Sequence, residues 1–269
     1  MQAADIIVQQ SWSKPSLIKS PFLRWVIFAT LAIYIVAAVR SFEIDVQRIM
    51  AGLDRGWTML QAFLRPDFAA RQHHIFQGIA ESVTMTVVAT SVGVLLAVPI
   101  TLGAAKNISP IPVYILCRLI LGVFRSLHVV ILAILFVIMF GFGPFAGVLT
   151  LIVNSIGFVG KLLAEDIENI NEEALEAIRS TGSSWSQMVL FGVWPQISTR
   201  FIGLSIYRAD QSFRQSTVIG LVGAGGIGGV LETAMGRYDY NTAGGILLVI
   251  IILVVLGEYS SSAIRRRLI

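Results

Sequence analysis

Long runs of apolar residues, separated by short polar segments, dominate this chain of 269 residues. A membrane-spanning helix needs about 20 mostly apolar residues. Six stretches approach that length, and none shows the alternating pattern of a strand. They cover residues 22–39, 79–105, 113–140, 145–163, 197–222 and 243–262. The pattern predicts an all-α integral membrane protein with about six transmembrane helices.

The polar segments divide the chain further. Residues 1–21 are expected to form a cytoplasmic tail, and residues 22–40 an uncleaved first anchor. In the external segment 41–75, Ile49, Leu53, Trp57 and Leu60 recur on one helix face, which predicts an amphipathic helix at the membrane interface. Residues 76–269 form the main transmembrane domain, whose polar loop 164–195 is long enough for a pair of short helices outside the membrane.

The composition supports a bilayer as the surroundings. Hydrophobic residues make up 55% of the chain and charged residues 13%, against about 25% charged in soluble domains. The formal net charge is +4, and basic residues cluster at the ends of apolar blocks, as cytoplasmic flanks do. We therefore expect both termini in the cytoplasm, and no nucleic acid as a partner. The clusters comprise Lys14, Lys19 and Arg24 at the beginning and Arg265, Arg266 and Arg267 at the end.

Several kinds of chemistry find no support in the sequence. Cys117 is the single cysteine, and no histidine has a partner at zinc-ligand spacing, so no metal or cofactor is expected on this chain. No phosphate-binding loop of the G-x-x-x-x-G-K-[ST] type occurs, so ATP hydrolysis would need another subunit. Residues 223–228 match the G-x-G-x-x-G dinucleotide fingerprint, but they follow a membrane-length segment instead of a strand. We interpret them as a non-helical turn between spans.

Charged residues inside the stretch 197–222 are the first functional candidates, because charges in a span rarely face lipid. Asp210 and Arg214 are one helical turn apart and can pair. Arg208 has no carboxylate four residues away. Its charge either meets a passing anion or pairs with a neighbouring carboxylate or with backbone carbonyls. Donors on its face extend a possible anion pathway, which comprises Arg208, Asp210, Gln211, Ser212, Arg214 and Gln215.

The polar loop carries the most specific motif. Glu176 and Ala177, then Gly182, then Pro195 thirteen residues later, resemble the E-A-A-x-x-x-G…P loop of ABC importer permeases. The resemblance implies a short helix, a glycine turn and a second helix that dock on an ATPase subunit, with coupling carried by Glu176, Ala177, Gly182 and Pro195. Gly192 departs from the family pattern, as does Trp194, where aliphatic residues are usual before the proline.

A second resemblance narrows the family. Residues 205–228 and 143–149 are similar to the corresponding stretches of phosphonate importer permeases, and the likeness covers roughly residues 75–265. It implies a type I ABC importer permease of the bacterial cytoplasmic (inner) membrane that forms its pathway with a second copy of itself. The implied partners are ABC ATPase subunits, which hold ATP and Mg, and an external phosphonate-binding protein. Phosphonate, phosphite and phosphate remain open as cargo.

Two other classes compete with this interpretation. An ion-coupled secondary transporter of a small anion would use Arg208 and Asp210 as its site, but it is expected to contain inverted repeats, and the sequence has no evident repeat. An intramembrane enzyme would need a nucleophile with its base, and neither Cys117 nor His128 has a suitable partner nearby in the sequence.

Overall fold

The computed structural model describes residues 20–41, 46–68 and 71–268. Within these ranges all regular structure is helical. The predicted cytoplasmic tail, with Lys14 and Lys19, lies outside them except for its last two residues. The chain divides into two units, Met1–Trp57 and Thr58–Ile269.

The first unit holds α1 (Pro21–Ser41) and most of α2 (Val46–Phe63). No residue of α1 is buried, and the helix is long and apolar enough to cross a membrane. It covers the first predicted span. In α2 the apolar side chains of Ile49, Leu53 and Trp57 are all at least half exposed. The amphipathic helix therefore exists, and its position at the membrane interface stays a prediction.

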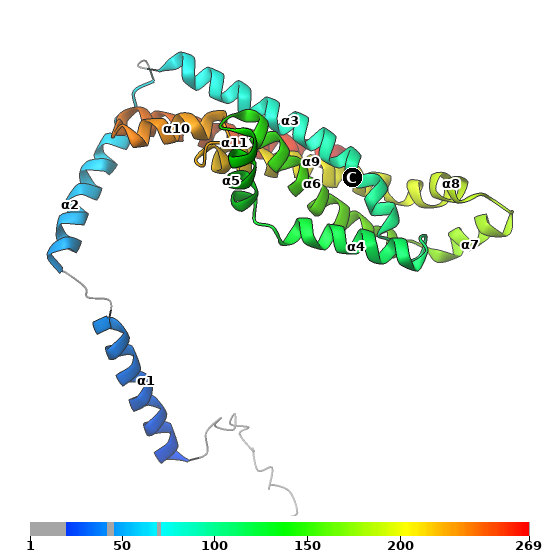
Figure 1. The fold of residues 1–269 in the computed structure, drawn as a ribbon, viewed down its shortest axis with the longest axis horizontal. Coiled ribbons are helices and arrows are strands. Elements are labelled where there is room, and N and C mark those ends of the chain that lie inside the picture. Colours follow the sequence, from blue (N-terminus) through cyan, green and yellow to red (C-terminus); the bar gives the residue numbers. More distant parts are fainter. Residues whose placement is uncertain (1–19, 42–45, 69–70, 269) are drawn as a thin grey trace, which may run out of the picture. The chain divides into compact units, whose positions relative to one another are not determined.

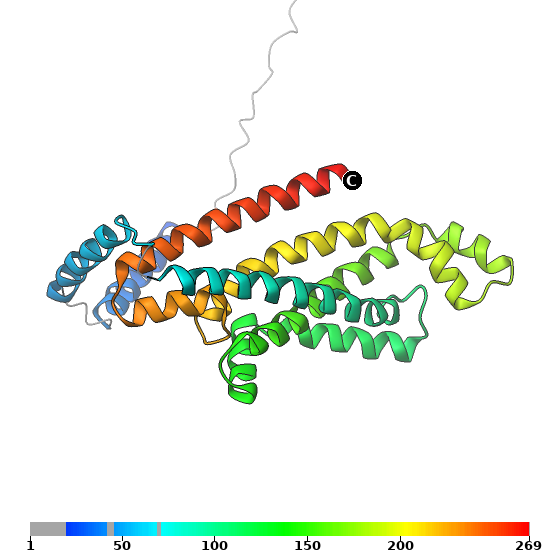
Figure 2. The same cartoon turned by 90° about the horizontal axis from the view of Figure 1, so that it is seen from above.

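The second unit is built around three long helices that run side by side, α3 (Gln72–Gly103), α6 (Pro144–Glu168) and α9 (Trp194–Gly220) (Figures 1 and 2). Small residues allow the close approach. A Cβ added to Gly93 of α3 would lie 2.6 Å from the Cβ of Ser155 on α6. Membrane helices rely on such small-residue contacts, because lipid supplies no hydrophobic driving force between them.

The ends of this bundle differ. The short helices α7 (Glu172–Ser180) and α8 (Trp185–Met188) lie at one end, whereas α10 (Gly226–Gly236) and the beginning of α11 (Tyr240–Leu268) lie at the other (Figure 2). Each end has its own buried apolar cluster. The loop 164–195 thus contains the short helices that its polarity predicted, with its first residues completing α6.

The predicted span 113–140 is not one continuous helix. The structure has two helices there, α4 (Ile111–Ser126) and α5 (Val129–Phe140), which meet at an angle of 90°. Leu127 and His128 adopt extended backbone between them, and the His128 Nδ1 atom accepts a hydrogen bond of 3.3 Å from the Val130 N–H. Hydropathy alone misses this break, because the imidazole caps a new helix without interrupting the apolar run.

In the described part of the chain, four helices qualify as membrane spans by length and composition, or up to five if the α4–α5 pair counts as one. They are α1, α3, α6 and α11. The sequence predicted about six spans. The sixth is α9, which does not meet these criteria. This helix is long enough at 27 residues, but it carries several charges. It packs against α3, α6, α10 and α11, so protein surrounds much of it.

The glycine-rich segment contains a helix that the sequence interpretation missed. A tight turn at residues 221–225 uses positive φ at Gly223 (90°) and Gly225 (77°), and α10 then begins at Gly226. Helices flank the turn on both sides, not the strand and helix that a dinucleotide site requires. Glycines at the crossing of α9 and α10 let the two backbones touch.

We predict that Gly228→Ala destabilises the second unit. The added methyl group would overlap the Thr217 carbonyl oxygen and lie 2.9 Å from the Gly220 Cα atom, so the expected loss is about 2 kcal/mol. The measurement is the unfolding temperature of the purified protein in detergent. Gly229→Ala is the matched control, because its nearest neighbour would be 3.7 Å away. Equal unfolding temperatures for both variants would contradict the close packing of α9 on α10.

Candidate coupling surface and anion pathway

The loop between α6 and α9 folds into a helical hairpin, which we define as residues 172–193. It comprises α7, α8 and a five-residue π-helix, Val189–Val193, that leads directly into α9. Asn171 caps α7 by accepting a hydrogen bond from the Glu173 N–H (2.9 Å). Gly182 turns the chain with φ of 77°, and its N–H donates to the Arg179 carbonyl oxygen (3.0 Å).

The four residues matched to the coupling motif all lie on the surface. Glu176 and Ala177 are exposed on α7, Gly182 at the turn, and Pro195 in the first turn of α9. The opposite side of the hairpin is buried, with Leu175 and other residues in an apolar cluster shared with α6. The hairpin thus presents its polar face outward from the bundle.

Gly192 and Trp194, the two departures from the motif, have a structural explanation. Gly192 is buried against α7, and a Cβ there would lie 3.1 Å from both the Leu175 Cδ2 and the Ile178 Cδ1 atoms. A larger side chain at this position would require Leu175 and Ile178 to shift. The Trp194 ring packs on Phe201, with ring centres 5.4 Å apart.

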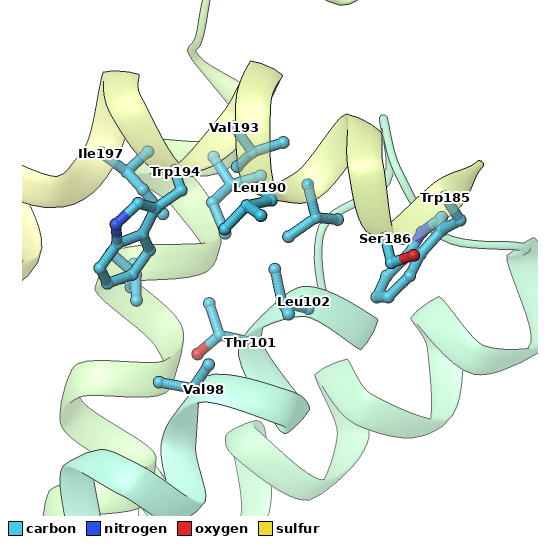
Figure 3. A pocket seen from close by; sticks show the side chains of 12 residues that line it. Val98, Thr101, Leu102, Trp185, Ser186, Leu190, Val193, Trp194 and Ile197 are labelled. Atoms are coloured by element: carbon cyan, nitrogen blue, oxygen red, sulfur yellow. The ribbon is translucent and has the colours of Figure 1, made fainter. Parts of the chain in front are cut away.

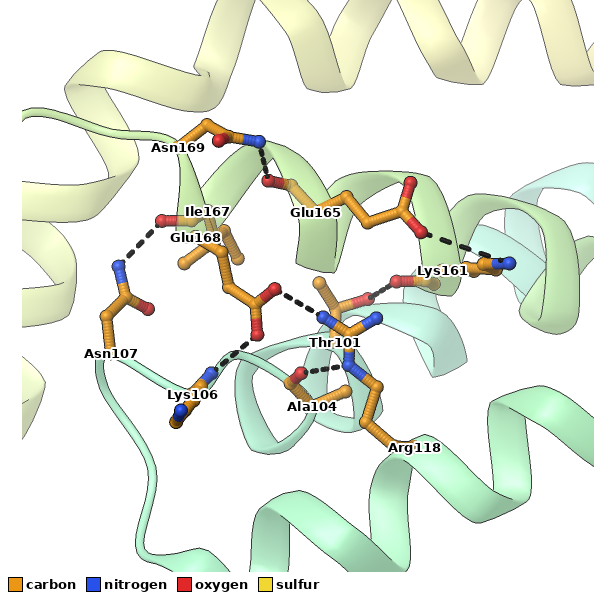
Figure 4. Close-up of polar contacts among 11 residues, drawn as sticks. Thr101, Ala104, Lys106, Asn107, Arg118, Lys161, Glu165, Ile167, Glu168 and Asn169 are labelled. Carbon is orange, nitrogen blue, oxygen red and sulfur yellow. Dashed lines mark hydrogen bonds and ion pairs between the residues drawn. The ribbon is translucent and has the colours of Figure 1, made fainter.

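Polar contacts tie the hairpin and α6 to the turn between α3 and α4. The Arg179 Nη2 atom donates to the Asn107 carbonyl oxygen (2.9 Å), and the Asn107 Nδ2 atom donates to the Ile167 carbonyl oxygen (2.8 Å; Figure 4). Glu168 accepts from the Lys106 N–H (2.9 Å) and from Arg118 Nη2 (2.6 Å). These contacts hold the hairpin to the ends of three helices.

An apolar pocket of about 360 Å³ lies where the hairpin meets α3 and α6 (Figure 3). Leu102, Trp185, Leu190 and Trp194 are among its lining residues. The Trp185 Nε1–H donates to the Ile108 carbonyl oxygen (2.9 Å). The hairpin is therefore held by both polar contacts and the buried apolar cluster, with a pocket left between them.

Arg208, the first pathway candidate, is fully buried in the middle of α9. Its Nε atom donates to the Ser155 Oγ atom (2.8 Å), and its Nη atoms donate to the side-chain oxygens of Gln211 and Gln215 (3.0 Å each). The expected partners, a carboxylate or backbone carbonyls, are not among these acceptors. The guanidinium is therefore hydrogen-bonded while its positive charge has no neutralising partner in these contacts.

A ladder of aromatic rings and arginines crosses four helices beside Arg208. The Arg208 Cζ atom is 5.6 Å from the centre of the Phe158 ring, and the Arg125 Cζ atom is 5.1 Å from the same centre. Phe158 stacks on Tyr207 at 5.8 Å, and Arg265 lies over Tyr207 at 5.8 Å. The sequence interpretation missed this group, because no spacing along the chain relates residues on four different helices.

The remaining pathway candidates separate into two environments. Ser212 is buried, and no group in the described part of the chain hydrogen-bonds to its hydroxyl. Asp210 and Arg214 form the predicted ion pair, and Glu258 of α11 lies 3.9 Å from the same guanidinium. The structure therefore brings Arg208, Gln211 and Gln215 together and places the ion pair beside α11. Among the described residues, no group of three His, Cys, Asp or Glu side chains could hold a metal ion.

Comparison with known proteins decides the family. The sequence profile of the "binding-protein-dependent transport system inner membrane component" family matches residues 97–269, which include the hairpin, α9 and the glycine turn. The chain belongs to this family. It is thus the membrane component of an importer, and its multi-pass helical fold agrees with that assignment.

Curated relatives are permeases for phosphorus oxyanions. The chain is 35% identical over 224 residues to the phosphite transport system permease protein PtxC of Stutzerimonas stutzeri, covering 83% of this chain and 81% of the relative. It is 38% identical over 205 residues to the phosphate-import permease protein PhnE of Mycolicibacterium smegmatis. That match covers 76% of this chain but only 38% of the mycobacterial protein.

Solved structures support the fold. The inward-facing MetNI methionine ABC transporter contains a chain that matches with a TM-score of 0.65 at 23% identity, over 75% of this chain and 99% of that one. An amino acid ABC transporter crystallised with histidines matches at a TM-score of 0.61 and 19% identity, over 75% of this chain and 98% of that one. The type I importer permease fold expected from the sequence is confirmed.

We predict that Arg179→Ala loosens the hairpin without unfolding the bundle. The variant loses the hydrogen bond to the Asn107 carbonyl oxygen and the 3.1 Å contact with the Met188 sulfur. Faster amide hydrogen exchange, by about fivefold, is expected across residues 172–193 and not in α3. Arg200→Ala is the control, because the exposed Arg200 only pairs with Asp166. Unchanged exchange in the hairpin would contradict its polar anchoring.

Proposed function

We propose that this chain is the permease subunit of an ATP-driven importer for phosphonate or a related phosphorus oxyanion. The curated relatives named above transport phosphite and phosphate according to their names. The observation that carries the ATP-driven part of the proposal is the hairpin. Its residues Glu176, Ala177 and Gly182 are exposed, and Arg179 bonds the hairpin to the turn between α3 and α4. The family membership favours this function over the ion-coupled secondary transporter.

Coupling follows from how the hairpin is held. ABC ATPase subunits, which bind ATP and Mg, would dock on the exposed face of α7 beside Gly182. A displacement of the hairpin is passed to α9 through the π-helix, which continues into it without a loop. Arg179 and Asn107 pass the same displacement to the turn between α3 and α4. One docking site therefore moves both sides of the bundle.

The pathway in this proposal forms between two copies of the chain. Arg208, Gln211, Ser212 and Gln215 supply positive charge and hydrogen-bond donors beside it. In the described conformation Arg208 is closed off by its own partners, so alternating access has to rearrange the side chains around it. A weak, transient site suits transport, since tight binding would trap the cargo.

We assign selectivity mainly to an external phosphonate-binding protein, since the family is described as binding-protein-dependent. We place the hairpin and both termini in the cytoplasm of a bacterium, and the α10 end outside. The basic residues Arg265 and Arg266 at the end of α11 agree with this orientation. The Asp210–Arg214 pair remains a candidate part of the pathway, although its charges largely neutralise one another.

We predict that Gly182→Asp abolishes uptake while the permease stays folded. The left-handed backbone and the added charge both disturb the docking turn, and transport should fall by at least about tenfold. Uptake of labelled phosphonate, phosphite and phosphate is measured in proteoliposomes with the ATPase and a loaded binding protein. Gly52→Asp, at an exposed glycine of α2 with free space around it, is the control. Full uptake by the Gly182 variant would refute docking at this turn.

We predict that charge at position 208 matters more than its exact hydrogen bonds. Arg208→Lys keeps the cation and should retain about a third of wild-type uptake, whereas Arg208→Gln should retain less than about a tenth. The amount of folded protein in detergent-solubilised membranes is measured alongside uptake. If both variants lose folded protein equally, Arg208 has a structural role only.

A further inference from the structure

A polar pocket lies at the end of the second unit opposite the hairpin. Its volume is about 540 Å³, and it is lined by residues from the beginning of α3 and from α10. Arg71, His74 and Gln77 line it from the α3 side, and Thr233 and Arg237 from α10. We call it the entry pocket. In contrast to the apolar pocket at the hairpin, five of its eleven lining residues have side chains that can donate hydrogen bonds.

The positive charges of the entry pocket are available. No hydrogen bond or ion pair within the described part of the chain engages the guanidinium of Arg71 or Arg237. Glu81 is the one carboxylate among the lining residues, and it is already occupied. Its Oε2 atom accepts from the Gly226 N–H and its Oε1 atom from the Gln77 Nε2 atom, at 3.1 Å each. Two arginines therefore line the pocket, and the one carboxylate in its lining already accepts two hydrogen bonds.

Closely packed glycines form one wall of the pocket. Gly78, Gly225, Gly226 and Gly229 all line it. A Cβ at Gly78 would lie 3.0 Å from the Ile227 Cα atom, so glycine here lets α3 and α10 approach closely, and the backbone at Gly225 and Gly226 has positive φ. The N–H groups of Gly226 and Ile227 are satisfied by Glu81 and Ser82, so the turn shapes the wall and the arginines supply the charge. The G-x-G-x-x-G segment thus acquires a role that the nucleotide motif did not provide.

We propose that the entry pocket is a binding site for the tetrahedral phosphorus oxyanion as it leaves the binding protein. This inference rests on the proposed function, which places this end outside. Guanidinium forks match phosphoryl oxygens in a bidentate manner, and Arg71 and Arg237 bring two such forks from separate segments. A concave pocket much larger than one oxyanion suits brief residence of a partly hydrated ion.

The test uses the whole transporter in proteoliposomes, with the ATPase and the loaded binding protein. Arg71→Gln, Arg237→Gln and the double variant are compared with Arg65→Gln, an exposed arginine that does not line the pocket. We expect the double variant to import at least about tenfold less phosphonate per ATP hydrolysed, and Arg65→Gln to match the wild type. The binding-protein concentration for half-maximal ATPase stimulation should not change.

Three results would overturn the inference. Wild-type uptake by the double variant would show that the pocket does not contact cargo. A higher half-maximal concentration of binding protein, loaded and empty alike, would assign the arginines to acidic groups of that protein. A defect present with phosphatidylglycerol in the vesicles but absent in pure phosphatidylcholine would assign them to lipid phosphates. Failure of the wild type to import any phosphorus oxyanion would instead refute the proposed function.

Discussion

The fold depends on keeping the polar groups of α9 out of lipid. Burying a guanidinium without partners costs several kcal/mol, so Arg208 requires acceptors from within the bundle. Ser155 of α6 and two glutamines of α9 itself provide them. The same requirement explains the small residues at the α3–α6 contact, because only a closely packed bundle can enclose a helix of this polarity.

The second unit has distinct chemistry along its length, which agrees with a transporter driven from one side. At the hairpin end, Arg179, Asn107 and Glu168 connect a surface loop to the ends of the long helices. In the middle, Arg125, Phe158 and Arg208 form a cationic group to which no carboxylate of the described residues is bonded. Beside α10, two arginines line the entry pocket.

The sequence predicted what depends on local patterns, and the structure added what depends on contacts between helices. Hydropathy and the motif at Glu176 and Gly182 were sufficient for the helical class, the family and the hairpin. The 90° break at His128 was missed, because the apolar run continues across it. The helix α10 was missed, since its glycines suggested only a turn. The Asp210–Arg214 pair followed from spacing, whereas the partners of Arg208 and the ladder at Phe158 join residues on different helices, which no spacing along the chain encodes.

The central claim is that this permease converts ATP hydrolysis by a partner into import of a phosphorus oxyanion. It is tested most directly by ATP hydrolysis in liposomes that hold this chain with its ATPase, to which the binding protein is added empty or loaded with phosphonate. The account predicts clear stimulation by the loaded form over the empty one. Equal rates of hydrolysis with the loaded and the empty binding protein would contradict the claim. Failure of the chain to assemble with the ATPase would contradict it as well.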